Sequence, residues 1–162
     1  MKKALWTLGL LLLLGGGYAT AAHLSGGAYP TFGLPLGGDR GLLRRTALAF
    51  WEDIQFKDFA RAASYHAPEI QGSVDIPYLL ERLFGIKPEM LDIMEIEVVL
   101  SDIDSTGLRA RVKTRLKVKL LVDASITERE VMLYFHRGVG EPWYMELETS
   151  LRSIEAENGK KH

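Results

Sequence analysis

Residues 108–122, LRARVKTRLKVKLLV, show the clearest structural pattern in the chain. From Leu108 to Val122 every even position is apolar or threonine, and the odd positions from Arg109 to Lys119 are all basic. Successive side chains of a β-strand point to opposite faces, so this alternation separates an apolar face from a charged face. The stretch therefore predicts a long strand with one buried face and one solvated face.

Three flanking segments extend this strand into a four-stranded antiparallel meander. Alternating segments at about 93–103, 126–137 and 143–151 are separated from it and from each other by turn-forming residues. The residues expected on the buried face of these segments are Met94, Ile96, Val98, Leu100, Val131, Leu133, Phe135, Trp143, Met145, Leu147 and Leu151.

The basic face of the long strand admits two interpretations. A continuous basic surface attracts nucleic acid or anionic lipid. Aligning the buried faces, however, places four of its residues opposite glutamates: Lys113–Glu97, Arg115–Glu95, Lys117–Glu130 and Lys119–Glu128. Opposite charges across neighbouring strands are ordinary sheet chemistry. We therefore predict an internally paired, solvated face and no nucleic-acid partner, with Arg109 and Arg111 left for an external contact.

The residues before the sheet predict three short amphipathic helices. Asp39, Asp58 and Asp75 are each suited to cap a helix N-terminus, and Pro68 and Gly85 end the second and third helices. The first helix has an apolar stripe of Leu43, Ala47, Phe50, Trp51 and Ile54, with Glu52, Asp53 and Gln55 on its polar side. Such stripes need a sheet to pack on. The expected fold class is therefore α+β, with N-terminal helices on a curved meander.

Residues 1–22 have the features of a targeting segment. Lys2 and Lys3 precede an apolar run, Gly15–Gly17 is expected to interrupt its helix, and Ala19-Thr20-Ala21 is a small-x-small cleavage pattern. Alternatively, the uncharged stretch 4–22 stays on the protein as a membrane anchor. The positive N-terminal end places the domain outside the cytoplasm in both cases. We expect a periplasmic protein, or one on the extracytoplasmic face of the inner membrane.

Composition divides the remainder of the chain into three parts. Residues 23–41 are rich in glycine, contain two prolines and lack periodicity, which predicts a linker. Residues 42–151 form the α+β domain, and residues 152–162 form a polar tail. The chain has no cysteine, and its four histidines are scattered. No disulfide, metal site or other cofactor is therefore predicted.

The order of elements resembles the nuclear transport factor 2-like (cystatin-like) superfamily, in particular its uncharacterised exported bacterial members. The resemblance covers about residues 42–151 and rests on this order and on KDFARAASYHAP at 57–68. It implies a sheet that curls around the first long helix and leaves a cone-like pocket. Members include ketosteroid isomerases and dehydratases, but also dimerising adaptors and anchored periplasmic domains of secretion components.

Few side chains are suited to line such a pocket. The candidate ligand-binding residues are Trp51, Tyr78, Thr114 and Arg129. Asp92 and Arg129 are predicted to pair at the pocket rim, because both point inward by parity. His66, at the predicted end of a helix, is expected to have a capping or surface role. The middle of the inward face has no acid–base pair, so no catalytic residue is predicted.

A second group of residues marks a candidate interface. Met132, Tyr134 and Tyr144 are expected on the outward face of the last two strands, together with Arg109 and Arg111. Exposed aromatic residues and methionine are typical of interfaces, here with a second copy or an envelope protein. We expect an extracytoplasmic, non-enzymatic module that binds a protein, itself or a small apolar ligand. The alternatives are a pocket enzyme of isomerase or dehydratase type and an anchored subunit of an envelope assembly.

Overall fold

The computed structural model describes residues 2–31, 34–147 and 149, and the chain divides into two units, Met1–Arg44 and Arg45–His162. The first unit contains α1 (Lys2–Leu24) and the beginning of α2 (Gly38–Gln55). The second contains the rest of α2, then α3 (Phe59–Ala63), α4 (Ile76–Phe84), the 3-10 turn η1 (Pro88–Met90), β1 (Leu91–Ile103), β2 (Arg109–Leu120), β3 (Ile126–His136) and β4 (Tyr144–Met145).

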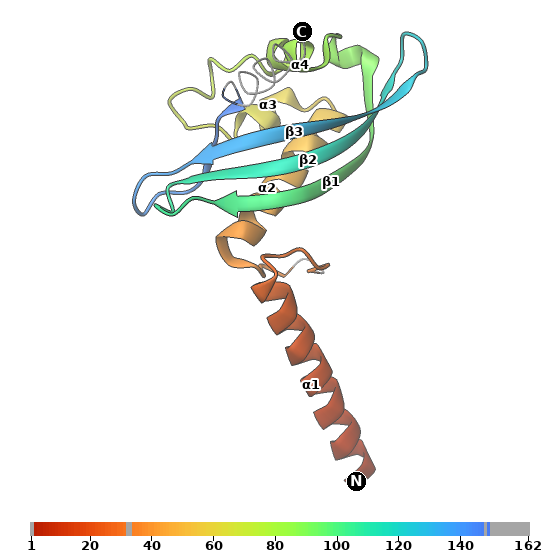
Figure 1. Ribbon diagram of the computed structural model, residues 1–162, viewed down its shortest axis with the longest axis vertical. Helices are drawn as coiled ribbons and strands as arrows, with labels where there is room; N and C mark the ends of the chain where they lie inside the picture. Colours follow the sequence, from red (N-terminus) through yellow and green to blue (C-terminus); the bar gives the residue numbers. More distant parts are fainter. Residues whose placement is uncertain (1, 32–33, 148, 150–162) are drawn as a thin grey trace. The chain divides into compact units, whose positions relative to one another are not determined.

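The strands form one antiparallel sheet in the order β1-β2-β3-β4. In Figure 1, β1, β2 and β3 run side by side across α2. The predicted α+β class and four-stranded meander are therefore confirmed. Among the residues that the structure describes, no helix combines the length and the apolarity needed to cross a membrane.

Side-chain caps define the short helices. Asp58 Oδ1 accepts the backbone N–H of Arg61 at 3.1 Å, and Asp75 Oδ1 accepts that of Tyr78 at 3.0 Å, as predicted. Gly85 ends α4 in the left-handed conformation. α3 is shorter than predicted because it ends at Ala63, five residues before Pro68.

The inner face of the sheet is the face that packs against α2. Its β2 residues Ala110, Val112, Thr114, Leu116 and Val118 are buried, as are the predicted residues of β3, Val131, Leu133 and Phe135. Phe50, Trp51 and Ile54 of α2 fill the space against them and have no exposed surface. Trp51 Nε1 donates to Thr114 Oγ1 at 3.0 Å, and the Thr114 hydroxyl donates to the Val131 carbonyl at 3.1 Å. These two bonds satisfy the buried Trp51 N–H and the Thr114 hydroxyl within the protein.

The outer face of the sheet is solvated and paired, but with partners two residues away from those predicted. Arg115 bridges Glu97 at 2.9 Å and Glu130 at 3.0 Å, Lys117 pairs with Glu95 at 2.9 Å, and Lys113 also pairs with Glu130. The expectation that Arg111 has no acidic neighbour was wrong, because Asp102 lies 3.1 Å from it. The shift on the β3 side arises because the turn closes earlier, through the Leu120 N–H and the Ser125 carbonyl.

β1 departs from the predicted alternation because its register shifts twice, between Ile93 and Glu95 and between Val98 and Leu100. Each irregularity reverses which side chains face inward. Met94 and Leu100 are therefore exposed, 45% and 41%, and Ser101 is buried, contrary to prediction. Asp92 lies opposite Lys119, and Arg129 lies opposite Leu116, so the predicted pair between Asp92 and Arg129 was wrong.

The last strand is also shorter than predicted. β4 contains only Tyr144 and Met145, and the described residues that follow it, Glu146, Leu147 and Thr149, lie outside the strand. Met145 and Leu147 are buried as expected, whereas Trp143 precedes the strand and is half-buried. Leu151 lies outside the described residues. The Met145 N–H donates to the Tyr65 carbonyl at 2.8 Å, which directs the chain toward the helices.

Candidate functional site

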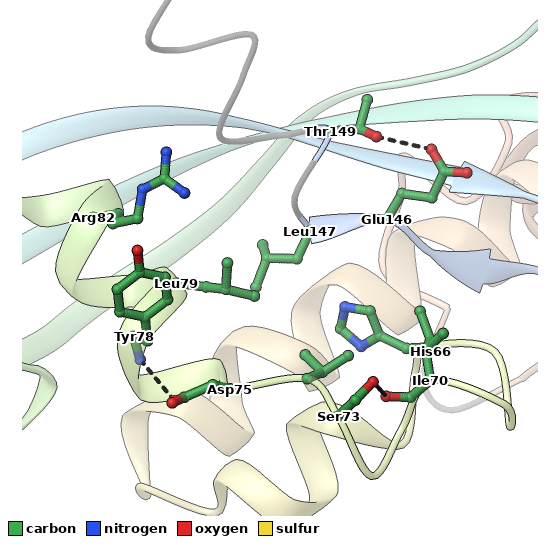
Figure 2. Close-up of a pocket in the computed structure, with 11 residues that line it drawn as sticks. His66, Ile70, Ser73, Asp75, Tyr78, Leu79, Arg82, Glu146, Leu147 and Thr149 are labelled. Carbon is green, nitrogen blue, oxygen red and sulfur yellow. Dashed lines mark hydrogen bonds between the residues drawn. The ribbon is translucent and has the colours of Figure 1, made fainter.

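A hollow of about 430 Å³ lies beside α4, and we call it the α4 hollow. α4 provides one side, the loop between α3 and α4 provides the second, and the residues after β4 provide the third (Figure 2). Its lining comprises His66, Ile70, Ser73, Val74, Asp75, Tyr78, Leu79, Arg82, Glu146, Leu147 and Thr149.

Local hydrogen bonds hold two sides of the α4 hollow. The Asp75 cap starts α4 so that Tyr78, Leu79 and Arg82 turn toward the hollow. In the α3–α4 loop, Gln71 Nε2 donates to the carbonyls of Ser64 at 3.1 Å and His66 at 2.8 Å. These bonds close the loop on itself and place its side chains without any regular secondary structure.

The α4 hollow has an apolar floor and a polar rim. Leu79 and Leu147 are buried and both line the hollow. His66 lines the same space although it is only 2% exposed, so the expected surface role was wrong. Its Nδ1 lies 3.2 Å from the carbonyl of Ala63, the last residue of α3, as expected for a capping role. Tyr78 stands at the rim with the Arg82 guanidinium carbon 5.9 Å from its ring centroid. An apolar floor with a few polar groups is the usual chemistry of a small-molecule site.

A second hollow, of about 550 Å³, lies where β2 and β3 meet the residues after β4, and we call it the strand groove. It brings together Arg109, Arg111 and Tyr134, three of the five predicted interface residues. The other lining residues are Asp102, Asp104, Ala110, Phe135, His136, Glu146 and Thr149. Of the remaining interface candidates, Met132 and Tyr144 are half-buried and do not line the groove.

Most of the acidic groups in the strand groove have a partner in the protein. Asp102 pairs with Arg111, and Glu146 Oε1 lies 2.9 Å from His136 Nδ1. A hydrogen bond from the Thr106 hydroxyl, together with nearby backbone N–H groups, lowers the pKa of Asp104. Within the described part of the chain, the Arg109 guanidinium forms no ion pair. Glu146 and Thr149 line both hollows and so form a partition between them.

A buried carboxylate that sequence reasoning missed lies on α2. Asp53 is 8% exposed, although it was predicted on the polar side of its helix. Its Oδ2 accepts the Tyr65 hydroxyl at 2.9 Å, and its Oδ1 lies 3.4 Å from Arg61 Nε. Burial, and then the hydrogen bond and charge of Asp53, raise the pKa of Tyr65 to about 12. The position of Asp53 three residues after Phe50, at the border of the apolar stripe, was the signal available in the sequence.

The four predicted ligand-binding residues do not form one site. Trp51 and Thr114 are bonded to each other in the core, Tyr78 lines the α4 hollow, and Arg129 is exposed on β3. Among the described residues, no group of three or more histidine and acidic side chains is arranged to hold a metal ion. Comparison of the chain with models of protein families, with curated proteins and with solved structures found no match.

Proposed function

We propose that the chain is an exported, non-enzymatic binding module that takes a small, largely apolar ligand in the α4 hollow. The observation that carries this proposal is the position of His66, which is almost completely buried yet lines a hollow with an apolar floor. Leu79 and Leu147 would contact the apolar part of the ligand, and the imidazole would hydrogen-bond to its polar group. A volume of about 430 Å³ suits a small organic molecule.

The packing of the inner face supports binding rather than catalysis. An isomerase or dehydratase of the kind that the sequence suggests needs an open pocket with a buried acid or base. Here the side chains of Phe50, Trp51 and Ile54 occupy the space on the inner face. The buried carboxylate of Asp53 is engaged by Tyr65 and Arg61, and it lines neither of the two hollows.

Family and location belong to the same proposal. The order of helices followed by a four-stranded antiparallel sheet supports membership of the nuclear transport factor 2-like superfamily, with α2 in the place of the cone-like pocket. Lys2 and Lys3 before a leucine-rich run support export to the periplasm or to the outer surface of the inner membrane.

The test is binding of a fluorescent apolar probe, anilinonaphthalene sulfonate, to the purified full chain and to two matched variants. Val74→Trp fills the α4 hollow, whereas Val139→Trp adds the same ring at a position that is 91% exposed and outside it. We expect Val74→Trp to weaken probe binding by about tenfold or more, which corresponds to ~1.4 kcal/mol. Val139→Trp should bind like the wild type. Equal binding by all three proteins would contradict the proposal.

A second candidate function is self-association through the strand groove. The observation that favours it is the convergence of Arg109, Arg111 and Tyr134 on one hollow. Arg109 lacks an ion pair in the described part of the chain, and a carboxylate of a second copy would supply one. Sedimentation of the wild type and of Arg109→Glu tests this function. A dimer that the charge reversal dissociates would support it, and a wild-type monomer would exclude it.

A further inference from the structure

The segment expected to be cleaved after Ala21 is helical in the structure. α1 continues from Lys2 to Leu24 without interruption, through Gly15–Gly17 and through Ala19-Thr20-Ala21. The prediction that the glycines break the helix was therefore wrong. The peptide bond between Ala21 and Ala22 lies in the last turn of this helix, rather than in the extended segment that a cleavage site requires.

The carbonyl groups on both sides of this bond are hydrogen-bonded. The Ala21 carbonyl accepts the Ser25 N–H at 3.0 Å. The Ala22 carbonyl accepts both the Gly27 N–H at 3.0 Å and the Ser25 hydroxyl at 2.9 Å. Ala22, which would become the first residue after cleavage, is 0% exposed. Its burial is unusual for a chain terminus, which normally lies at the surface.

The following residues fold back on the end of α1, and we call residues 25–31 and 34–37 the collar. The Tyr18 hydroxyl donates to the Pro30 carbonyl at 2.7 Å, and the Gly37 N–H donates to His23 Nδ1 at 3.2 Å. Two side chains of the last turns of α1 are thus bonded to residues twelve and fourteen positions further along the chain. The described residues of the collar are therefore hydrogen-bonded to the end of α1 at Pro30 and Gly37.

Glycine is required where the collar crosses itself. A Cβ atom on Gly37 would lie 2.5 Å from the backbone nitrogen of Gly27, a distance that real Cβ atoms do not show. Gly37 also has φ +91, which side-chain-bearing residues rarely adopt. The glycines that suggested flexibility thus allow two backbone segments to touch.

We infer that the folded chain resists signal peptidase and keeps residues 2–21 in the mature protein. A protease acts on locally unfolded chain, so the cleavage rate follows the population in which the site has opened. Opening here requires loss of the helical turn, of the collar hydrogen bonds and of the burial of Ala22. The inference depends on the proposed export only for its biological meaning, because resistance is a property of the folded first unit.

Retention would leave an apolar surface on the protein. Leu10, Leu11, Leu12, Leu13 and Leu14 are 60–76% exposed, and as consecutive residues they cover all sides of the helix. Their transfer from water to lipid is favourable. A retained α1 would therefore hold the binding module at a bilayer surface. This agrees with the alternative in which residues 4–22 stay on the protein as an anchor, rather than with release after cleavage.

The direct test treats the purified full chain with purified bacterial signal peptidase in mild detergent and follows the intact mass. We expect the wild type to remain uncut and Gly37→Val, which opens the collar, to lose residues 1–21. The matched control is Gly140→Val, at a glycine with φ +79 but with open space around its Cβ position. This control should remain uncut. Tyr18→Phe removes one collar bond without altering the glycines, and it should be cut at a measurable but slower rate.

Each result decides the inference. Cleavage of the wild type at the rate of Gly37→Val would overturn it, because the collar would then offer no protection. If Gly37→Val and Tyr18→Phe both stayed uncut, the assignment of resistance to the collar would be wrong. If only Gly37→Val were cut, the Tyr18 hydroxyl would contribute nothing measurable to the protection, and resistance of the folded wild type would still stand.

A measurement in cells separates this inference from the export proposal. With alkaline phosphatase fused to the C-terminus, activity reports export and the intact mass reports processing. We expect an active reporter on a chain that retains residues 2–21. An active reporter on a chain beginning at Ala22 would overturn retention and leave export standing. An inactive reporter would overturn export, while the peptidase assay would still decide retention.

Discussion

The inner and outer faces of the sheet are formed by alternate residues of the same strands, yet different forces stabilise them. The inner face removes Trp51 and its neighbours from water and satisfies one tryptophan N–H through the Thr114 hydroxyl. The outer face holds ion pairs between side chains that remain partly or largely exposed, such as Arg115 with Glu97. Burial of apolar surface contributes far more free energy per residue than an exposed ion pair. The inner face should therefore determine stability, and the outer face solubility and register.

The largest effect is expected from Trp51→Ala on the inner face. Removing a fully buried indole leaves a cavity and should lower the free energy of unfolding by about 3–5 kcal/mol. Trp143→Ala is the matched control, because Trp143 is only half-buried at the sheet edge and should cost clearly less. Urea denaturation of the full chain measures both. Equal losses would show that the contact between α2 and the sheet is not the dominant core.

A smaller effect is expected where a charge lies beneath the surface. Tyr65→Phe removes the hydroxyl that donates to the buried Asp53 carboxylate, and it should cost about 1–2 kcal/mol. Tyr78→Phe, at a more exposed ring, should change stability by less than about 0.5 kcal/mol. Chemical denaturation at pH 7 distinguishes the two variants.

The same tyrosine predicts a loss of stability at high pH. The pKa of Tyr65 is about 12 in the folded chain and 10.0 in an unperturbed tyrosine. Between these values the folded state binds the proton more tightly than the unfolded state, so stability is fully present below pH 10 and falls as the pH rises toward 12. Tyr65→Phe should have a shallower decline than the wild type over this interval. If the stability of the wild type and of Tyr65→Phe declined equally over this interval, the raised pKa would not belong to Tyr65.

Substitutions on the outer face should change the free energy of unfolding only slightly, and the change should depend on the salt concentration. Arg115→Ala breaks the bridge between Glu97 and Glu130 and should lower the free energy of unfolding only slightly at low salt, and less still at high salt. Hydrogen bonds from Lys113 and then Arg115 lower the pKa of Glu130. The ionised Glu130 carboxylate therefore stabilises the folded chain at neutral pH, and this stabilisation is lost as the pH falls through the pKa of Glu130 in the folded state. Arg109→Ala is the control, because Arg109 forms no ion pair with the residues that the structure describes, and its effect on stability should not depend on salt.

The parts of the fold that the sequence predicted correctly are those with a simple period. β2 alternates without interruption from Arg109 to Lys119, so these side chains lie on the expected faces, although the strand ends at Leu120 and Val122, predicted on the buried face, is 70% exposed. The helix caps at Asp58 and Asp75 also follow a local rule. The ion pairs between β2 and β3 differ from those predicted because the register of two strands depends on where the turn between them closes. When the centre of that turn moves by one residue, every residue of one strand faces a partner two positions away on the other.

The candidate site was harder to predict because it depends on contacts between distant residues. His66 and Asp53 are polar residues whose burial results from packing with segments that have no periodic pattern. The composition of the collar predicts a linker, because glycine indicates either flexibility or a close backbone approach, and only the position of Gly37 against Gly27 decides between them.

The smallest expected effect concerns β1, where the prediction from the sequence and the structure place Leu100 on opposite faces. Leu100 was predicted in the core, but the second register shift places it on the exposed side. Leu100→Thr should therefore change the free energy of unfolding by less than about 0.5 kcal/mol. Leu91→Thr, at the buried start of the same strand, should cost about 2 kcal/mol or more. If the two costs were equal, β1 would alternate without its irregularities, and the ion pairs of Glu95 and Glu97 would have to move to the partners that simple alternation predicts.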